Sequence, residues 1–187
     1  MTGPFATGDL PAPPIDAQFD HVALAVPRIV DALPIYRDLL GGRFFTGGDN
    51  QRLGYRGVQL TLPGGKIEIL EPLEGSDFLD SFLAGRPHGG LHHVTFTVPD
   101  LHDAITELER AGFPVHGEST ADARWQEVFV HPKSANGVLV QFAQTGPGYG
   151  TDPFDLEQVL AGHGNQGNQQ PSPGYPAAPQ HRRDTQR

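Results

Sequence analysis

Two histidines stand at corresponding positions of an internal repeat. His21 lies within residues 19–27 (FDHVALAVP), and His93 lies within residues 91–99 (LHHVTFTVP). The two segments align without a gap at an offset of 72 residues (93 − 21). A repeat of this kind predicts two similar structural units that present equivalent side chains. Imidazoles at equivalent positions are candidate ligands for a divalent metal ion.

Strand parity adds a carboxylate and an amide to this pair. Apolar residues alternate within residues 22–26, as in a strand with one packed face, so His21 points to the other face. The same alternation in KIEIL and VLVQF turns Glu68 and Gln141 away from their packed neighbours, and these two match at an offset of 73 (141 − 68). We therefore expect His21, Glu68, His93 and Gln141 to converge on one site.

These four side chains offer two imidazoles, one carboxylate and one amide oxygen. Such a set suits one divalent ion (Mn, Co, Ni, Fe or Zn) and leaves open positions for water or substrate. From the residues alone an ordinary structural role for each of the four stays open, because a lone histidine or glutamate in a strand usually has one.

The elements that would position the site follow the same order in both halves. Each histidine-bearing strand is followed by an amphipathic helix: residues 29–40 precede Gly41-Gly42, and residues 101–111 follow an Asp100 N-cap. Further strands come next, at 57–62 and 66–70 and again at 127–131 and 138–143, whereas Gly47-Gly48 is expected in a turn. The fold class is therefore α+β: two βαβββ modules, about 19–75 and about 91–146, forming a cupped, mostly antiparallel sheet around a central site.

Composition bounds the rest of the chain. The 187 residues carry a formal net charge of −9 and no cysteine, which argues against nucleic-acid binding, disulfides and thiolate sites. No apolar run suggests a membrane span or a signal peptide, so we expect a cytoplasmic protein. Residues 1–18 read as a Pro-rich flexible arm, and residues 147–187 as a mostly disordered Gln/Pro/Gly tail with one short helix near 153–160.

Several segments resemble a known family. They are the two strand–helix openings, residues 74–83 (EGSDFLDSFL) ahead of Gly90, and residues 131–140 (HPKSANGVLV). Over residues 19–145 the chain resembles the vicinal oxygen chelate superfamily (glyoxalase, bleomycin resistance, dioxygenase), and within it methylmalonyl-CoA epimerases and glyoxalase I. The resemblance implies that the protein binds one divalent metal ion and forms a homodimer. It also implies a small-molecule substrate, of a class to which thioesters belong. It places the four metal ligands on His21, Glu68, His93 and Gln141.

The family chemistry implied is proton abstraction next to a carbonyl or thioester, which gives a metal-stabilised enolate. The epimerases typically carry glutamates where this chain has Gln59 and Gln141, and glutamine cannot accept the proton. Gln59 therefore occupies the position of a catalytic base of the family but cannot act as one. Glu68 is predicted to be both a metal ligand and the base. Glu127 and Glu71 are reserve candidates.

Two further functions stay open. Two histidines and one carboxylate can hold Fe(II) for a ring-cleaving dioxygenase. The replacement of the family's carboxylates by Gln59 and Gln141 equally suits a protein that binds a small molecule without catalysis, as drug-resistance proteins do. A metal-dependent isomerase, epimerase or lyase remains the function that the residues favour.

Overall fold

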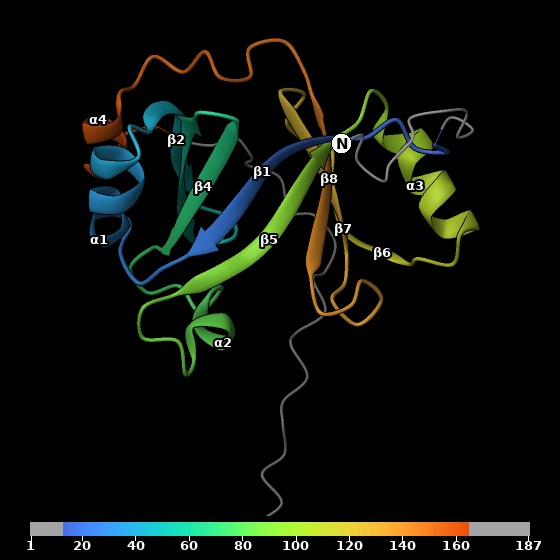
Figure 1. The fold of residues 1–187 in the computed structure, drawn as a ribbon, viewed down its shortest axis with the longest axis horizontal. Coiled ribbons are helices and arrows are strands. Elements are labelled where there is room, and N and C mark those ends of the chain that lie inside the picture. Colours follow the sequence, from blue (N-terminus) through green and yellow to red (C-terminus); the bar gives the residue numbers. More distant parts are fainter. Residues whose placement is uncertain (1–12, 165–187) are drawn as a thin grey trace, which may run out of the picture.

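The computed structural model describes residues 13–164, so the predictions for residues 1–12 and 165–187 lie outside the described residues. One sheet of eight strands runs through both halves in the order β2-β3-β4-β1-β5-β8-β7-β6. Figure 1 shows this sheet curling between α1 and α4 on one side and α3 on the other. The predicted cupped α+β fold of two βαβββ modules is confirmed.

The elements of the first module are β1 (Gln18–Ala25), α1 (Ile29–Leu33), a π-helical turn (Pro34–Leu39), β2 (Arg43–Asn50), β3 (Tyr55–Leu62) and β4 (Gly65–Pro72). After α2 (Asp80–Leu83) come those of the second, β5 (Gly90–Thr97), α3 (Leu101–Arg110), β6 (Val115–Ser119), β7 (Trp125–Val130) and β8 (Leu139–Thr145), and then α4 (Leu156–Leu160). In each module the first strand pairs in parallel with the last, as β1 with β4 and β5 with β8. The modules meet where β1 pairs antiparallel with β5.

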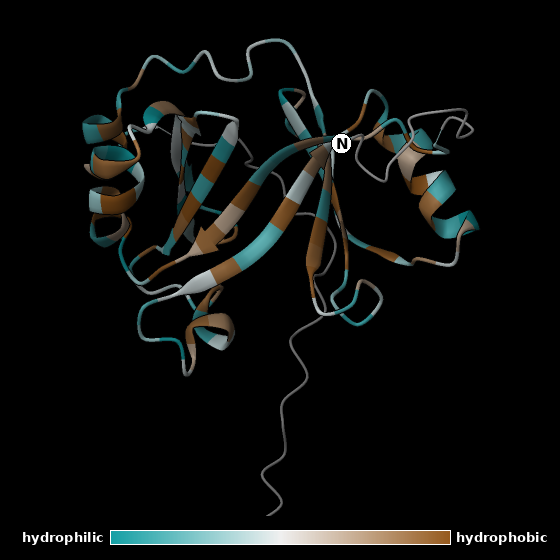
Figure 2. Cartoon of the chain, in the orientation of Figure 1, coloured by the Kyte–Doolittle hydropathy of each residue, from teal (hydrophilic) through white to brown (hydrophobic). Residues whose placement is uncertain are grey.

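Alternating side chains divide each strand between the concave face and the helix-covered face. Figure 2 shows this alternation as bands of hydropathy along β1, β4 and β5. On the helix side of the first module, Ile29 of α1 packs with Leu60 and Ile69, all three fully buried. The second module has its own smaller core, which includes Leu101 of α3 and Val128 of β7. Burial of these apolar side chains is the main force that fixes the curvature of the sheet.

The helix predicted over residues 29–40 is shorter and changes form at Pro34. Proline lacks an N–H and clashes with a preceding carbonyl, so the α-helix ends there. The chain continues as a π-helical turn, closed by a hydrogen bond from the Leu40 amide to the Ile35 carbonyl (3.0 Å). Leu40, at the end of the predicted helix, is exposed. The Asp100 cap of α3 does form, accepting a hydrogen bond from the Asp103 amide (2.9 Å).

Gly47-Gly48 lies inside β2, so its assignment to a turn is wrong. The Cα of Gly47 pairs with that of Val58, and a Cβ at Gly47 would come within 2.7 Å of the Gly57 carbonyl oxygen. Glycine is needed here because two backbones approach closely. The preference of glycine for turns, on which the prediction rested, does not reveal such a requirement.

Residues 147–164, which the sequence analysis assigned to the tail, pack on the folded body; we call them the strap. The strap leaves β8 in the second module and crosses to the first, where α4 lies beside α1 (Figure 1). Leu156 and Val159 of α4 complete the core that contains Ile29. A capping box formed by Asp155 and Gln158 begins this short helix. The folded body therefore extends well beyond residue 146.

Candidate active site

Three neighbouring strands bring His21, Glu68 and His93 together on the concave face. The Cα of Ala23 on β1 pairs with that of Glu68 on β4 and with that of His93 on β5. Ala23 is fully buried, and its small side chain leaves room for the larger groups on either side. One ligand atom from each of the three polar residues lies within 4.8 Å of the others.

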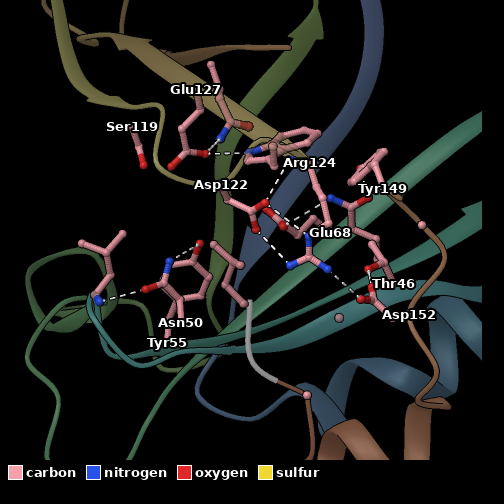
Figure 3. Close-up of a pocket in the computed structure, with 18 of the residues that line it drawn as sticks. Thr46, Asn50, Tyr55, Glu68, Ser119, Asp122, Arg124, Glu127, Tyr149 and Asp152 are labelled. Atoms are coloured by element: carbon pink, nitrogen blue, oxygen red, sulfur yellow. Dashed lines mark hydrogen bonds and ion pairs between the residues drawn. The ribbon is translucent and has the colours of Figure 1, made fainter. Parts of the chain in front are cut away.

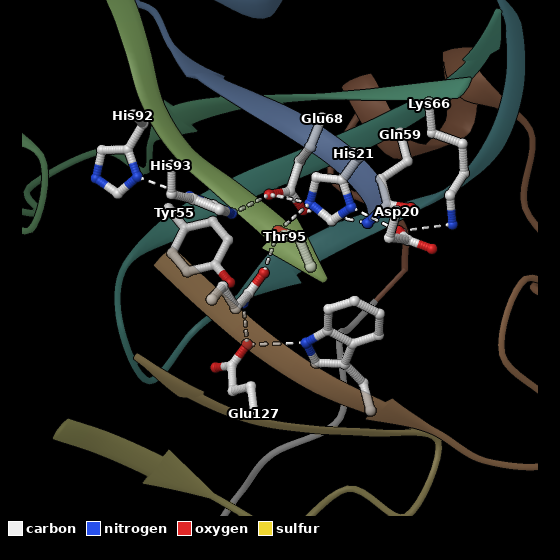
Figure 4. A network of polar contacts seen from close by, with 12 residues as sticks. Asp20, His21, Tyr55, Gln59, Lys66, Glu68, His92, His93, Thr95 and Glu127 are labelled. Carbon is white, nitrogen blue, oxygen red and sulfur yellow. Dashed lines mark hydrogen bonds and ion pairs between the residues drawn. The ribbon is translucent and has the colours of Figure 1, made fainter. Parts of the chain in front are cut away.

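Glu68 is the centre of this cluster. Its Oε2 lies 3.6 Å from Nε2 of His21 and 3.4 Å from Nε2 of His93. Figure 4 shows both imidazoles directed toward this carboxylate. Burial by itself would raise the pKa of Glu68, but His21 and His93 outweigh it and lower that pKa to about 2. Glu68 is therefore ionised throughout the neutral range.

His21 lies between two carboxylates. Its Nδ1 is 2.7 Å from Oδ2 of Asp20, which also pairs with the ammonium of Lys66 at 2.9 Å. Burial favours the neutral ring, yet Asp20 and Glu68 outweigh that effect and raise the pKa of His21 to about 9. In the metal-free protein a proton on His21 therefore balances Glu68. A divalent cation would supply the same compensation in place of that proton.

His93 has the opposite character. Its Nε2 is buried and has no hydrogen-bond partner among residues 13–164, and burial lowers the pKa of the ring to about 3. A neutral imidazole with an unpartnered nitrogen facing a carboxylate is the form that ligates metals. This orphaned nitrogen shows that the residues fit a divalent ion held by His21, Glu68 and His93.

Gln141 reaches the cluster through a chain of hydrogen bonds. Its Oε1 accepts from the Thr95 hydroxyl (2.6 Å), and that hydroxyl lies 3.0 Å from Nε2 of His21. Its Nε2 donates to Oε2 of Glu127 (2.6 Å), which also accepts from the indole of Trp125 (2.8 Å). Gln141 is thus placed beside the three clustered residues, and its role as a fourth ligand stays a prediction.

Glu127 is a second carboxylate on the same cavity, and it is buried. It projects from β7, which three intervening strands separate from the strand of Glu68. Burial, reinforced by the negative charge of Glu68, raises the pKa of Glu127 to about 6. The two carboxylates therefore have pKa values displaced in opposite directions. The other reserve candidate, Glu71, accepts a hydrogen bond from the Ile29 amide (2.6 Å) and pairs with Arg56, so its observed role is structural.

Gln59 also faces the cavity, but as part of a network. Its Nε2 donates to Oε1 of Glu68 (3.5 Å), and its Oε1 accepts from the Tyr149 hydroxyl (2.8 Å). Tyr149 belongs to the strap and also lies 3.2 Å from the ammonium of Lys66. An amide in this position orients Glu68 and cannot act as a base.

The cavity has a volume of about 270 Å³ and is lined by both modules and the strap. Figure 3 shows a polar wall in which the guanidinium of Arg124 lies between Asp122 and Asp152, and Thr46 donates to Asp152.

The sequence did not reveal Thr95 as a residue of the site, although Thr95 lies on the same face of its strand as His93. Nor did it reveal Arg52 and the strap residues, for which no periodic pattern gave a signal.

Comparison with known proteins identifies the family. A family model described as the Glyoxalase/Bleomycin resistance protein/Dioxygenase superfamily matches residues 20–129. The chain belongs to this superfamily. Within residues 13–164, no helix is long and apolar enough to cross a membrane.

Individual relatives in this superfamily are epimerases. The chain is 38% identical over 130 residues to the ethylmalonyl-CoA/methylmalonyl-CoA epimerase of Cereibacter sphaeroides, across 68% of this chain and 97% of that protein. The crystal structure of methylmalonyl-CoA epimerase from Mycobacterium tuberculosis is similar, with a TM-score of 0.64, 27% identity, and coverage of 78% and 98% of the two chains. A Streptomyces coelicolor methylmalonyl-CoA epimerase variant in complex with 2-nitronate-propionyl-CoA has a TM-score of 0.59 and 26% identity, covering 69% and 97%.

Proposed function

We propose that this protein epimerises the α-carbon of a 2-carboxyacyl-CoA thioester of the methylmalonyl-CoA type. The observation that carries the proposal is the pair of carboxylates that line one cavity, Glu68 with its pKa lowered to about 2 and Glu127 with its pKa raised to about 6. Titratable groups whose environments displace their pKa values in opposite directions mark an acid and a base. The similarity to epimerases named for methylmalonyl-CoA supports the choice of substrate.

Epimerisation needs one group to remove the α-proton and a second to return a proton to the opposite face of the carbon. Glu68 and Glu127 come from different modules and reach the cavity from strands separated by β1, β5 and β8. In one direction the ionised Glu68 takes the proton and the protonated Glu127 returns one. In the reverse direction the two exchange roles, so no other reactant is consumed.

Other residues position these two groups. Gln59 donates to one oxygen of Glu68, and Gln141 and Trp125 donate to one oxygen of Glu127, so each carboxylate is oriented by neutral amides or an indole. A divalent ion held by His21, Glu68 and His93, with Gln141 as the predicted fourth ligand, would act as a Lewis acid that stabilises the charge developing on the thioester oxygen. The identity of that ion, the homodimer and the cytoplasmic location stay predictions.

The test is solvent deuterium entering the α-carbon of methylmalonyl-CoA, followed by mass spectrometry on protein purified without a metal-binding tag. Metal content per chain is measured in parallel by elemental analysis. We expect exchange in the wild-type protein. In Glu127→Gln we expect the rate of epimerisation, followed as conversion of one stereoisomer into the other, to fall by about 10² to 10⁴, the range typical of a general acid or base. Glu127→Gln should keep its metal, whereas Glu68→Gln should lose both metal and exchange.

Glu109→Gln is the matched control, because Glu109 is an exposed glutamate of α3 outside the cavity. Its exchange rate should equal that of the wild-type protein. Epimerisation in Glu127→Gln within threefold of wild type would remove Glu127 from the mechanism. No exchange in wild type with any of Mn, Co, Ni, Fe or Zn would reject the epimerase and leave a dioxygenase or a non-catalytic binder.

A second candidate function rests on the His21–Glu68–His93 cluster itself. Two histidines and one carboxylate are the donor set of non-haem Fe(II) oxygenases. Oxygen uptake with a catechol and Fe(II), absent in His93→Ala, would favour this function over epimerisation. Glu127 has no role in that reaction, so Glu127→Gln separates the two candidates.

A further inference from the structure

Arg52 is a cavity residue with an unsatisfied donor. It lies in the turn between β2 and β3 and lines the cavity, and its Nε is buried without a hydrogen-bond partner in the described part of the chain. Leaving a buried donor of a charged group unpaired is unfavourable, so the protein gains when a ligand supplies an acceptor. This feature is independent of the residues proposed to hold metal.

The other arginine of the cavity is already neutralised. Arg124 pairs with Asp122 at 2.9 Å and with Asp152 at 3.4 Å, as Figure 3 shows. Within residues 13–164, Arg52 takes part in no such ion pair. Its positive charge does act on the buried Glu127, which places Arg52 on the Glu127 side of the cavity.

The backbone around Arg52 is held in place. The Asn50 side chain accepts a hydrogen bond from the Leu53 amide (3.0 Å), and the Gly54 amide donates to the Asn50 carbonyl (2.7 Å). Gly54 in turn accepts from the Leu73 amide (2.9 Å), which ties the turn to the end of β4. A guanidinium on a fixed turn loses less entropy on binding than one on a mobile loop, so it is suited to bind an anion.

We propose that Arg52 is the anion-binding residue of the cavity and receives the free carboxylate of the acyl group. This inference rests on the proposed function, for which it names the group that a substrate must carry next to the reacting carbon. Glu68, Glu127, Asp122 and Asp152 all line the cavity and would repel an anionic acyl group. A guanidinium offers two parallel donors that match a carboxylate and offset that repulsion.

A phosphate of the coenzyme A carrier has the same oxyanion chemistry, so the experiment separates the two sources. Epimerisation is measured with methylmalonyl-CoA and with the methylmalonyl thioester of N-acetylcysteamine, which has no phosphate. Arg52→Gln should raise KM about 10- to 100-fold with both substrates, the loss typical of a charged hydrogen-bonded pair. Arg52→Lys, which keeps the charge without the fork, should give a smaller increase.

A binding measurement keeps this test independent of catalysis. Calorimetric titration of the wild-type protein with methylmalonate should show binding that propionamide, which has no carboxylate, lacks. Arg52→Gln should weaken methylmalonate binding about 10- to 100-fold, whereas Arg110→Gln, an exposed arginine on α3, should not change it. Thermal unfolding of each variant establishes that it is folded.

Three results would overturn the assignment. They are unchanged methylmalonate binding in Arg52→Gln, no binding of methylmalonate to the wild-type protein, and a KM effect confined to the coenzyme A substrate, which would assign Arg52 to a phosphate. Methylmalonate binding through Arg52 without any deuterium exchange would instead reject the proposed epimerase and leave the anion site standing.

Discussion

Raising the pH of the metal-free protein should destabilise it through one residue, His21. The imidazole is buried beside Asp20 and Glu68, and its pKa is raised from 6.5 to about 9. A base whose pKa is raised on folding stabilises the folded state below its unfolded pKa, and that stability is lost as the pH rises through its folded pKa. The affected window is therefore about pH 6.5 to 9.

The magnitude follows from the size of the shift. A displacement of about 2.5 pKa units at about 1.36 kcal/mol per unit corresponds to roughly 3 kcal/mol of unfolding free energy. This is a large share of the roughly 5–15 kcal/mol that stabilises a typical domain. The chain has no cysteine, so no thiol titrates in the same window.

The assay is urea unfolding of chelator-treated protein at pH 6.5, 7.5, 8.5 and 9.5. Wild type should lose stability steadily up to about pH 9. His21→Gln should be less stable at pH 6.5, because Asp20 and Glu68 lose their partner, but its stability should not change across the window. His102→Gln, an exposed histidine of α3, should follow the wild-type curve.

The same proton should compete with metal. Binding of a divalent ion requires a neutral imidazole, so the metal affinity of the wild-type protein should rise about tenfold per pH unit until it levels near pH 9. Two results would refute this reasoning: constant stability of the apoprotein from pH 6.5 to 9, or a metal affinity that levels near pH 6.5. Either result would mean that Asp20 and Glu68 do not hold His21 protonated.

Three further predictions concern the framework of the site. Ile69→Ala should lower the unfolding free energy by about 2–5 kcal/mol in urea because it opens a cavity in a fully buried core, whereas Ile35→Ala at an exposed position should change it little. Gly146→Ala should lower the melting temperature markedly, because the new Cβ would clash with the Ala123 carbonyl oxygen; an unchanged melting temperature would contradict that geometry. Asp155→Ala removes the cap of α4 and should cost about 1 kcal/mol, detected as faster hydrogen exchange confined to the strap.

Much of the site could be predicted because its residues follow the two-residue alternation of β-strands and an internal repeat. Alternation in the strands assigned His21, Glu68 and His93 to one face, and the repeat indicated that two modules would bring these faces together. Glu127 was visible only as a reserve candidate. Neither its strand parity nor the loop lengths around it could be fixed from the sequence, and its distance from Glu68 depends on how the two modules pair.

Of the strap, the sequence predicted only a short helix near residues 153–160, which α4 confirms. The packing of the strap on the body could not be predicted, because it depends on distant contacts. Tyr149 is held by Gln59 and Lys66 of the first module, more than 80 residues earlier in the chain. Glycines and prolines around it give no amphipathic pattern. Arg52 was missed for a similar reason: a charged residue in a turn is usually solvated, and only the folded cavity buries its Nε.

The position of α4 has a consequence for how the chain acquires its structure. Leu156 and Val159 pack in the same core as Ile29, so residues near the end of the described chain complete the interior of the first module. That module cannot finish folding when its own sequence has been synthesised, since part of its apolar surface stays uncovered until α4 arrives. Contacts between residues so far apart in sequence slow folding, because a long loop must close before they form. Although the two halves look like a duplicated unit, the first therefore takes part of its core from residues that follow the second.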